Sequence, residues 1–252
     1  YGVPFDTFQG EIALAREAAH SKSRILHAGG DATGKHIELT LAGLARVSGI
    51  TILEYSLATQ ILTKDGYAIG IEALDTQHGT FHSYGADNII LATGGAGCLF
   101  RYTTNPQVAT GDGVALAFQA GAQVADMEFV QFHPTALRLR GAPPFLISEA
   151  VRGEGGVLRN SLGQRFMQKY DPSEELAARD IVSQSINIEL QKTNSDHVML
   201  DLTHLKTEQI TNRFPTIYRF CLDHGLDITK SSIPVAPAAH YLMGGIHTNT
   251  WG

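Results

Sequence analysis

The sequence predicts an α/β protein that forms one large domain or two smaller ones. Three observations support this class: the 252-residue chain is 43% hydrophobic, it contains 26 glycines, and stretches with helical periodicity alternate with short strand-like runs. No apolar run reaches the length of a transmembrane helix and no signal peptide opens the chain, so we expect no membrane partner. The formal net charge of −6 provides no basic surface, which argues against nucleic acid as a partner.

Cysteine usage indicates a reducing compartment. Cys98 and Cys221 lie far apart in the sequence and have no CxxC spacing. This argues against a disulfide framework and against a zinc site, and it is typical of a cytoplasmic protein. We expect both residues to be buried thiols, not nucleophiles, and we expect no metal.

The first fifth of the chain predicts two helices separated by a strand-like segment. Residues 11–20 are rich in helix formers, whereas residues 21–28 resemble a strand. Residues 37–46 carry apolar side chains at helical spacing, and Thr33 stands where an N-cap residue would lie.

Strand signals dominate the next segment. Residues 50–63 resemble a strand interrupted near Ser56. The runs 67–74 and 80–86 are separated by a short polar turn, which is typical of an antiparallel hairpin. Residues 88–92 are mostly apolar and predict a short buried strand.

A glycine-rich turn follows that predicted strand. Residues 93–97 read Thr-Gly-Gly-Ala-Gly, and glycine at such a turn lets the backbone approach a cofactor because it has no Cβ. Residues 111–113 read Gly-Asp-Gly and begin a predicted helix over 114–121. Asp112 could cap this helix or accept hydrogen bonds from the hydroxyls of a cofactor, and the spacing favours neither.

The character of the sequence then changes. Residues 131–156 are loop-rich and polar, and they precede two predicted helices over 174–190 and 207–222. Pro215 interrupts the second of these helices. Residues 233–246 return to an apolar segment.

These changes predict three segments. Residues 1–127 and 240–252 form a nucleotide-binding α/β part, and residues 128–239 form an inserted, largely helical part. The insertion carries most of the polar residues that could bind a substrate.

One polar cluster stands out within the loop-rich stretch. His133, Ser148, Glu149 and Arg152 place an imidazole, a hydroxyl, a carboxylate and a guanidinium among apolar residues and glycines. A site that grips a small dicarboxylate needs such fixed donors in a pocket that excludes water. The same residues also suit a turn and a helix start whose charges are solvated.

The motifs together resemble the flavoproteins of the succinate dehydrogenase/fumarate reductase family, whose order they follow. The motifs that carry the resemblance are LATGGAG at 91–97, TTNP at 103–106, GDG at 111–113, HPT at 133–135, RGEG at 152–155 and PAAHYLMGG at 237–245. Three further runs, at 2–6, 16–21 and 24–34, resemble the L-aspartate oxidases within that family.

The resemblance implies a partial FAD-binding Rossmann-like domain with an inserted α+β capping domain. The residues that it implies for the dicarboxylate site are His133, Ser148, Glu149 and His240. Ser148 stands where the family often has threonine, and the hydroxyl is retained. Arg179 matches the proton-transfer arginine of the family; by residue type alone, it would be a helix-surface arginine paired with Asp180 or Glu175.

The resemblance also implies a cofactor, FAD, bound without a covalent link. The residues that would contact it are Leu57, Ala58, Thr93, Gly94, Gly95 and Asp112. Glu17 matches an acidic residue of the L-aspartate oxidases, and its carboxylate could accept the ammonium group of the substrate, which succinate lacks. Without the resemblance, Glu17 is most simply a solvated helix residue.

The implied activity is oxidation of L-aspartate to iminoaspartate, the first step of de novo NAD synthesis. Hydride would pass to N5 of FAD, and O2 or fumarate would reoxidise the flavin. Quinolinate synthase would be a candidate protein partner. A fumarate reductase or succinate dehydrogenase flavoprotein is the rival interpretation, because it shares the HPT, RGEG and PAAHY motifs, and a catalytically idle scaffold is a third.

The family's amino-terminal GxGxxG segment and its carboxyl-terminal part do not occur in these 252 residues. The first would bind the FAD pyrophosphate, and the second would supply a further substrate arginine. We therefore expect this piece alone neither to hold FAD tightly nor to turn over.

Overall fold

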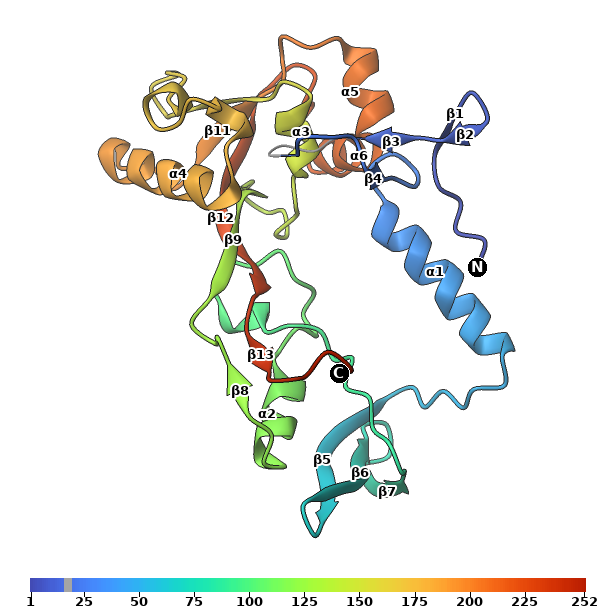
Figure 1. The fold of residues 1–252 in the computed structure, drawn as a ribbon. Coiled ribbons are helices and arrows are strands. Elements are labelled where there is room, and N and C mark those ends of the chain that lie inside the picture. The colour runs from blue at the N-terminus through green and yellow to red at the C-terminus, as the bar shows by residue number, and fades with distance from the viewer. Residues whose placement is uncertain (16–19) are drawn as a thin grey trace. The chain divides into compact units, whose positions relative to one another are not determined.

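The computed structural model describes residues 1–15 and 20–252 (Figure 1). Glu17, a predicted substrate residue, lies outside the described residues. Within the described part, no helix is both long enough and apolar enough to cross a bilayer.

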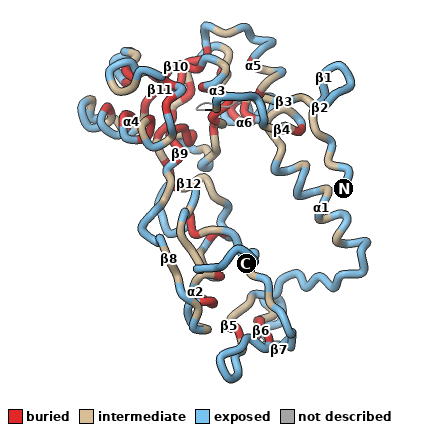
Figure 2. The backbone as a smooth tube through the Cα atoms, viewed as in Figure 1, coloured by how far each residue is buried: buried red, intermediate tan, exposed pale blue. Residues whose placement is uncertain are grey.

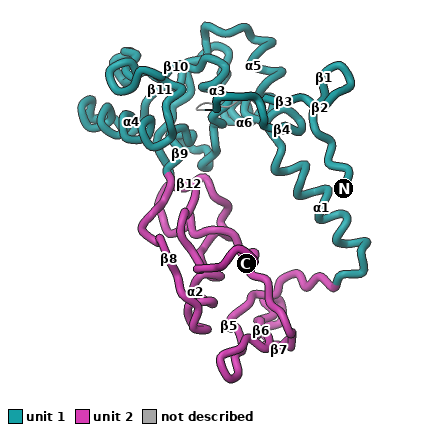
Figure 3. The backbone as a smooth tube through the Cα atoms, in the orientation of Figure 1, with its two compact units in different colours: residues 1–50, 132–238 teal, residues 51–131, 239–252 magenta. Residues whose placement is uncertain are grey.

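The chain divides into two compact units, which Figure 3 colours separately. Unit 1 comprises residues 1–50 and 132–238, and unit 2 comprises residues 51–131 and 239–252. These units are defined by packing within the chain, so the functional division into a cofactor part and a capping part stays a prediction.

Unit 1 is built on a sheet with the strand order β10-β11-β12-β9. The strands are β9 (Val130–Leu137), β10 (Val157–Arg159), β11 (Val198–Asp201) and β12 (Ile233–Leu242). β10 and β12 both pair antiparallel with β11, and this register puts Leu158 opposite Leu200 and Leu200 opposite Ile233. These three side chains are fully buried, and Figure 2 shows buried residues at β10 and β11. The core of unit 1 therefore centres on this sheet.

Four helices and two 3₁₀ turns belong to the part of unit 1 that follows residue 131. They are α3 (Glu149–Gly153), α4 (Arg179–Thr193), α5 (Thr207–Arg213) and α6 (Pro215–Asp223), with 3₁₀ turns at Met167–Lys169 and Glu174–Leu176. The predicted break at Pro215 is confirmed, because α5 ends and α6 begins around it. The predicted start of the preceding helix at residue 174 is wrong. Ala177 and Ala178 have extended backbone after the 3₁₀ turn, so Arg179 becomes the first residue of α4.

The amino-terminal part of unit 1 contains short strands and one long helix. These elements are β1 (Thr7–Phe8), β2 (Glu11–Ile12), β3 (Leu14–Ala15), β4 (Ile25–Leu26) and α1 (Thr33–Val47). The predicted helix over 11–20 is wrong in its described part, because β2 pairs with β1 and β3 pairs with β4. Helix α1 is confirmed, but Thr33 is not its N-cap. Its hydroxyl instead accepts a hydrogen bond from Ala28 N at 3.1 Å.

Unit 2 contains a three-stranded antiparallel sheet, a helix and a small two-stranded sheet. Its elements are β5 (Ser56–Lys64), β6 (Tyr67–Asp75), β7 (Thr80–Gly85), a 3₁₀ turn (Gly97–Leu99), α2 (Asp112–Gln119), β8 (Val124–Ala125) and β13 (Gly245–Ile246). The β6–β7 hairpin and α2 confirm their predictions. The predicted buried strand over 88–92 is wrong: no described strand pairs with it, and Ile90 is 90% exposed.

The two cysteines differ in their surroundings. Cys221 on α6 is fully buried, and this burial raises the pKa of its thiol to about 11. Cys98 is exposed on the 3₁₀ turn of unit 2, where its Sγ lies 3.2 Å from the carbonyl oxygen of Pro106. The prediction of two buried thiols is therefore right for Cys221 and wrong for Cys98.

Candidate functional site

Unit 2 contains a pocket of about 500 Å³ at the glycine-rich turn. Residues 91–95, 240–242 and 244–246 form most of its wall. Three of the predicted cofactor residues, Thr93, Gly94 and Gly95, thus lie beside His240, a predicted substrate residue. The pocket has the size and the mostly apolar lining of a small-molecule site.

Two glycines explain how this turn is held. Gly111 precedes α2 with a φ of +82°, a left-handed conformation that favours glycine. A Cβ on Gly113 would lie only 1.8 Å from Thr93 Oγ1, so the threonine packs directly against the first turn of α2. A Cβ on Gly94 or Gly95 would meet no atom within 4 Å. The backbone of the turn is therefore anchored on one side and open on the other, where a ligand could approach it.

The other predicted cofactor residues lie elsewhere in unit 2. Asp112 is the first residue of α2 and is exposed, and the residue that precedes the helix is Gly111, which makes no side-chain cap. Leu57 and Ala58 lie on β5, where they pair with Leu74 and Ala73 of β6. None of Asp112, Leu57 and Ala58 is among the residues that line the 500 Å³ pocket.

His240 is fixed by residues that the sequence reasoning did not select. The ring Nδ1 of His240 lies 2.7 Å from the hydroxyl of Thr104, and Asn105 Nδ2 donates to the backbone oxygen of His240 at 2.8 Å. Thr104 and Asn105 belong to the TTNP motif. The motif was the available signal, but nothing in the sequence linked it to a residue about 136 positions away.

In unit 1, Glu149 bridges two arginines. Its Oε1 accepts from Arg152 NH2 at 3.0 Å, and its Oε2 accepts from Arg179 Nε at 3.0 Å and lies 2.9 Å from Arg179 NH2. Glu149 is 7% exposed and Arg152 is 1% exposed. The interpretation of these residues as solvated charges is therefore wrong. The pairing of Arg179 with Glu149 likewise replaces the expected pairing with Asp180 or Glu175.

Arg152 connects this cluster to the backbone at Glu175. Its NH1 donates to the backbone oxygen of Glu175, while its Nε is buried without a hydrogen-bond partner among the described residues. Burial lowers the pKa of Arg152, and the charge of Glu149 opposes that effect. The sequence placed Arg152 in the polar cluster suited to a dicarboxylate, but the family resemblance did not include it in that site. The Glu149-x-x-Arg152 spacing would place the two residues on one face of a helix.

Ser148 and His133 are two further predicted substrate residues of unit 1. Ser148 is the N-cap of α3, and its Oγ accepts from Ala150 N at 3.2 Å. The sequence had predicted a loop at His133, but this residue lies on β9. It is 1% exposed. Because Thr135 N can only donate, His133 Nδ1 accepts its hydrogen bond at 3.3 Å. The neutral ring then carries its proton on Nε2, where it can act as a donor.

Comparison with known proteins identifies the family. All 252 residues match the family model described as "FAD binding domain". The chain belongs to the FAD binding domain family. FAD is therefore its cofactor, in agreement with the sequence prediction and with the mixed helix and strand architecture.

Two curated relatives are similar along the whole chain. An L-aspartate oxidase of Acinetobacter baylyi is 47% identical over 99% of this chain and 47% of its own length. An L-aspartate oxidase of Synechocystis sp. is 49% identical over 99% of this chain and 46% of its own length. The chain thus spans about half the length of the curated relatives that it matches.

A solved structure shows the same arrangement of the backbone. The structure described as "Quinol-Fumarate Reductase with Menaquinol Molecules" matches with a TM-score of 0.90 at 36% identity, over 98% of this chain and 46% of that chain. The similarity to both groups of proteins agrees with the family resemblance of the motifs.

The pocket of unit 2 fits part of a FAD molecule. The open side of Gly94 and Gly95 gives a flat ligand access to backbone donors and acceptors, which glycine permits. The residues that would hold FAD there are Thr93, Gly94 and Gly95. When bound, FAD supplies an acceptor for two electrons, and the protein supplies orientation and electrostatics.

Proposed function

We propose that the protein containing this chain oxidises L-aspartate to iminoaspartate with FAD, as the first step of de novo NAD synthesis. The observation that carries this proposal is the buried Glu149 held between Arg152 and Arg179, next to the hydroxyl of Ser148 at the start of α3. Fixed guanidinium, imidazole and hydroxyl donors are the groups that a small dicarboxylate requires. The similarity to L-aspartate oxidases supports the choice of aspartate.

In this proposal His133, Ser148 and His240 donate to the carboxylates of the substrate. His133 carries its proton on Nε2, and Ser148 keeps a hydroxyl proton for which the described residues provide no acceptor. Glu149 acts on the substrate indirectly: its carboxylate pairs with Arg152 and Arg179 and thereby positions these two arginines. The substrate oxygens therefore meet donors and not an unpaired carboxylate.

Arg179 is the proposed catalytic residue. Glu149 holds the Nε and one terminal nitrogen of Arg179. The side chain of Arg179 is 28% exposed, so a ligand can contact it. A guanidinium holds its proton tightly and is a poor base, so arginine acts more readily as a proton donor when fumarate is reduced. We propose that Arg179 serves the reaction in both directions as the group that holds the transferred proton.

Glu17 is the proposed discriminator for aspartate. A carboxylate can pair with the ammonium group of L-aspartate, and this interaction is missing for succinate and fumarate. We therefore expect Glu17→Gln to reduce the preference for aspartate over fumarate. An equal effect on both ligands would remove Glu17 from this role.

A fumarate reductase or succinate dehydrogenase flavoprotein is the second candidate function, because the solved structure with a TM-score of 0.90 carries a fumarate reductase name. The experiment is anaerobic reduction of the FAD-loaded protein by L-aspartate and, separately, by succinate, followed by flavin absorbance. Faster bleaching by aspartate supports the first proposal. Bleaching by succinate alone supports the second, and bleaching by neither leaves only an idle scaffold.

The same assay tests Arg179. We expect Arg179→Ala to abolish turnover while FAD stays bound, because the substitution removes a group outside the proposed cofactor residues. Arg219→Ala is the matched control, since Arg219 is 75% exposed and pairs, among the described residues, with Asp223 on the same helix. Full activity of Arg179→Ala would exclude Arg179 from the mechanism.

The remaining parts of the proposal concern what surrounds the reaction. We propose that FAD is bound without a covalent link, that O2 or fumarate reoxidises it, and that the protein acts in the cytoplasm with quinolinate synthase as a candidate partner. Acid precipitation tests the first point, because flavin that stays with the protein pellet would show a covalent link.

A further inference from the structure

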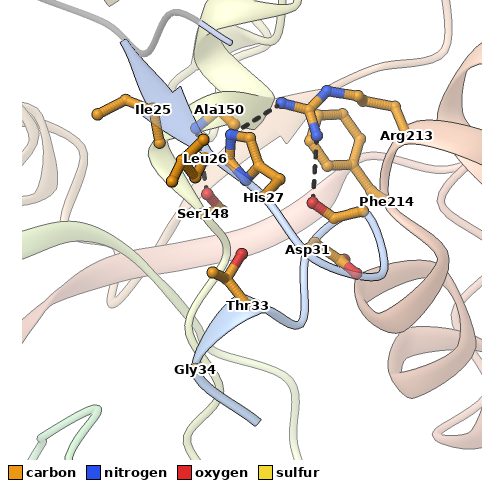
Figure 4. A pocket seen from close by; sticks show the side chains of 11 residues that line it. Ile25, Leu26, His27, Asp31, Thr33, Gly34, Ser148, Ala150, Arg213 and Phe214 are labelled. Atoms are coloured by element: carbon orange, nitrogen blue, oxygen red, sulfur yellow. Dashed lines mark hydrogen bonds between the residues drawn. The ribbon is translucent and has the colours of Figure 1, made fainter. Parts of the chain in front are cut away.

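Unit 1 contains a second pocket of about 310 Å³, which shares no lining residue with the 500 Å³ pocket of unit 2. The segment from Ile25 to Gly34 forms one wall, and Ser148, Ala150, Arg213 and Phe214 form the other (Figure 4). Its polar groups include a guanidinium, an imidazole and a hydroxyl, the same set of donors that the carboxylate site uses.

Two carboxylates hold the first wall, the segment from Ile25 to Gly34, in place. Asp6 accepts hydrogen bonds from the backbone nitrogens of Gly29 and Gly30 at 2.9 and 3.0 Å. Asp31 accepts from the backbone nitrogens of Thr216 and Ile217, at the start of α6, at 3.1 and 2.9 Å. Both negative charges are thus directed at backbone donors, and the loop is fixed before any ligand arrives.

Arg213 is bonded weakly for a residue of its type. Its Nε donates to Glu154 Oε1 at 3.2 Å, NH1 donates to the backbone oxygen of Gly30 at 3.3 Å, and NH2 lies 3.4 Å from His27 Nε2. Two of these three acceptors are neutral, and all three distances exceed the roughly 2.7–2.9 Å of charge-assisted hydrogen bonds. A carboxylate in the pocket could therefore replace two long bonds by shorter and stronger ones.

Two further donors stand near the guanidinium. Because arginine can only donate, the contact with Arg213 makes His27 Nε2 an acceptor and leaves the proton of a neutral ring on Nδ1. Ser148 Oγ accepts from Ala150 N, so its hydroxyl proton can point into the pocket. Figure 4 shows Ser148, His27 and Arg213 on the pocket wall.

The apolar residues of the wall decide between kinds of anion. Ile25, Leu26 and Phe214 line the pocket beside the donors. They suit the methylene groups of an organic acid, whereas inorganic phosphate would gain nothing from them.

We propose that this pocket binds a carboxylate of a small organic acid through Arg213, with Ser148 as a second donor. The proposal rests on the proposed function, because it assigns Arg213 to the recognition of the same class of substrate. Arg213 has no role among the residues that the sequence had selected.

The test is an NMR titration of the ¹⁵N-labelled chain with succinate, without FAD and without turnover. We expect succinate to shift the Arg213 side-chain signal, and Arg213→Gln to weaken binding about tenfold or more. Arg219→Gln, the exposed control on α6, should bind succinate like the wild type. No binding by the wild-type chain, or unchanged binding by Arg213→Gln, would overturn the proposal.

A second variant separates binding from a purely structural role. Glu154→Gln removes the charged partner of Arg213 but leaves the guanidinium in place. If Arg213 binds the ligand, succinate should bind this variant at least as tightly as the wild type, because one competing carboxylate is gone. If Arg213 only braces the loop, Glu154→Gln should weaken binding as Arg213→Gln does, and the proposal fails.

Two other probes define the ligand class. Succinamide has the same carbon chain without charge, and we expect it not to bind. Inorganic phosphate tests whether any small anion suffices, and binding as tight as that of succinate would refute the assignment to organic acids. Since none of these titrations measures flavin reduction, the pocket can fail while the proposed oxidation of aspartate stands, and the reverse also holds.

Discussion

Replacing Glu149 by glutamine is expected to destabilise unit 1 by about 3 kcal/mol. Glutamine has nearly the same shape as glutamate, so the substitution changes charge without opening a cavity. The carboxylate lost is the one that Arg152 and Arg179 share. The effect should therefore report the electrostatics of this buried cluster alone.

The magnitude follows from the exposure of the two arginines. The side chain of Arg152 is 0% exposed, so it cannot turn to water when its charged partner is removed. Breaking a buried pair on one side costs about 3–5 kcal/mol. The amide oxygen of glutamine can still accept one hydrogen bond, which returns about 1 kcal/mol. Arg179 is 28% exposed and can be solvated, so its loss adds little.

Urea unfolding of the wild type and of Glu149→Gln measures this difference. Glu154→Gln serves as the control, because Glu154 pairs with Arg213 at 36% exposure and should change stability by less than about 1 kcal/mol. The double variant Glu149→Leu, Arg152→Met removes both buried charges. It should lose less stability than the sum of the losses in the single variants Glu149→Leu and Arg152→Met. A Glu149→Gln variant within about 1 kcal/mol of the wild type would refute this reasoning.

Three further predictions concern positions away from the substrate residues. Burial acts to raise the pKa of Asp201, but hydrogen bonds from Thr203 and Arg159 outweigh it and lower the pKa from 3.8 to about 2. Asp201→Asn should therefore cost about 2 kcal/mol at neutral pH, and this difference should vanish as the pH falls from 3.8 through about 2, where the folded state gains its proton. Gly113→Ala should cost about 2 kcal/mol and weaken FAD binding, because its Cβ would lie 1.8 Å from Thr93 Oγ1. Asp31→Ala should cost about 1–2 kcal/mol, because the first turn of α6 loses two acceptors.

Each of these has a matched control. Asp223→Asn removes an exposed carboxylate that pairs with Arg219 on the same helix, so an equal loss of stability in this variant would contradict both aspartate predictions. Gly95→Ala should leave stability unchanged because its Cβ would meet no atom within 4 Å. Thr93→Gly should restore the stability of Gly113→Ala, and a failure of this rescue would show that the threonine is not what the new methyl group strikes.

Elements with local signals could be predicted from the sequence. Helix α1 and the β6–β7 hairpin follow from apolar spacing and a polar turn, both of which act within a few residues. The failures involve pairing with distant segments. Residues 11–15 contain helix formers but pair as strands, and residues 88–92 look like a strand but lack a described partner.

The HPT run lies in a strand that the sequence did not predict. His133, Pro134 and Thr135 belong to β9, although residues 131–156 had been predicted to be loop-rich. A proline removes only one backbone donor, and β9 keeps its place beside β12 through the others. Sequence proximity does not show that a neighbouring strand is available.

The candidate site divides in the same way. The pairing of Glu149 with Arg152 could be read from their spacing on one helix, whereas the pairing with Arg179 joins residues 30 positions apart. The link between His240 and Thr104 spans 136 positions. Motif resemblance selected His240 and Arg179 without saying what holds them, and only the folded chain supplies those partners.

The contrast between the two thiols gives the chain a built-in chemical reporter. Because only thiolates react with alkylating reagents, the exposed Cys98 should be modified readily. Cys221 is buried on α6 of unit 1, and burial raises the pKa of its thiol to about 11, so it should react slowly. A folded chain should therefore take up one label, at Cys98. The rate at which a second label is added would measure the rate at which Cys221 on α6 becomes accessible. Since Pro106, the contact of Cys98, also lines the 500 Å³ pocket of unit 2, the first label can carry a dye close to that pocket.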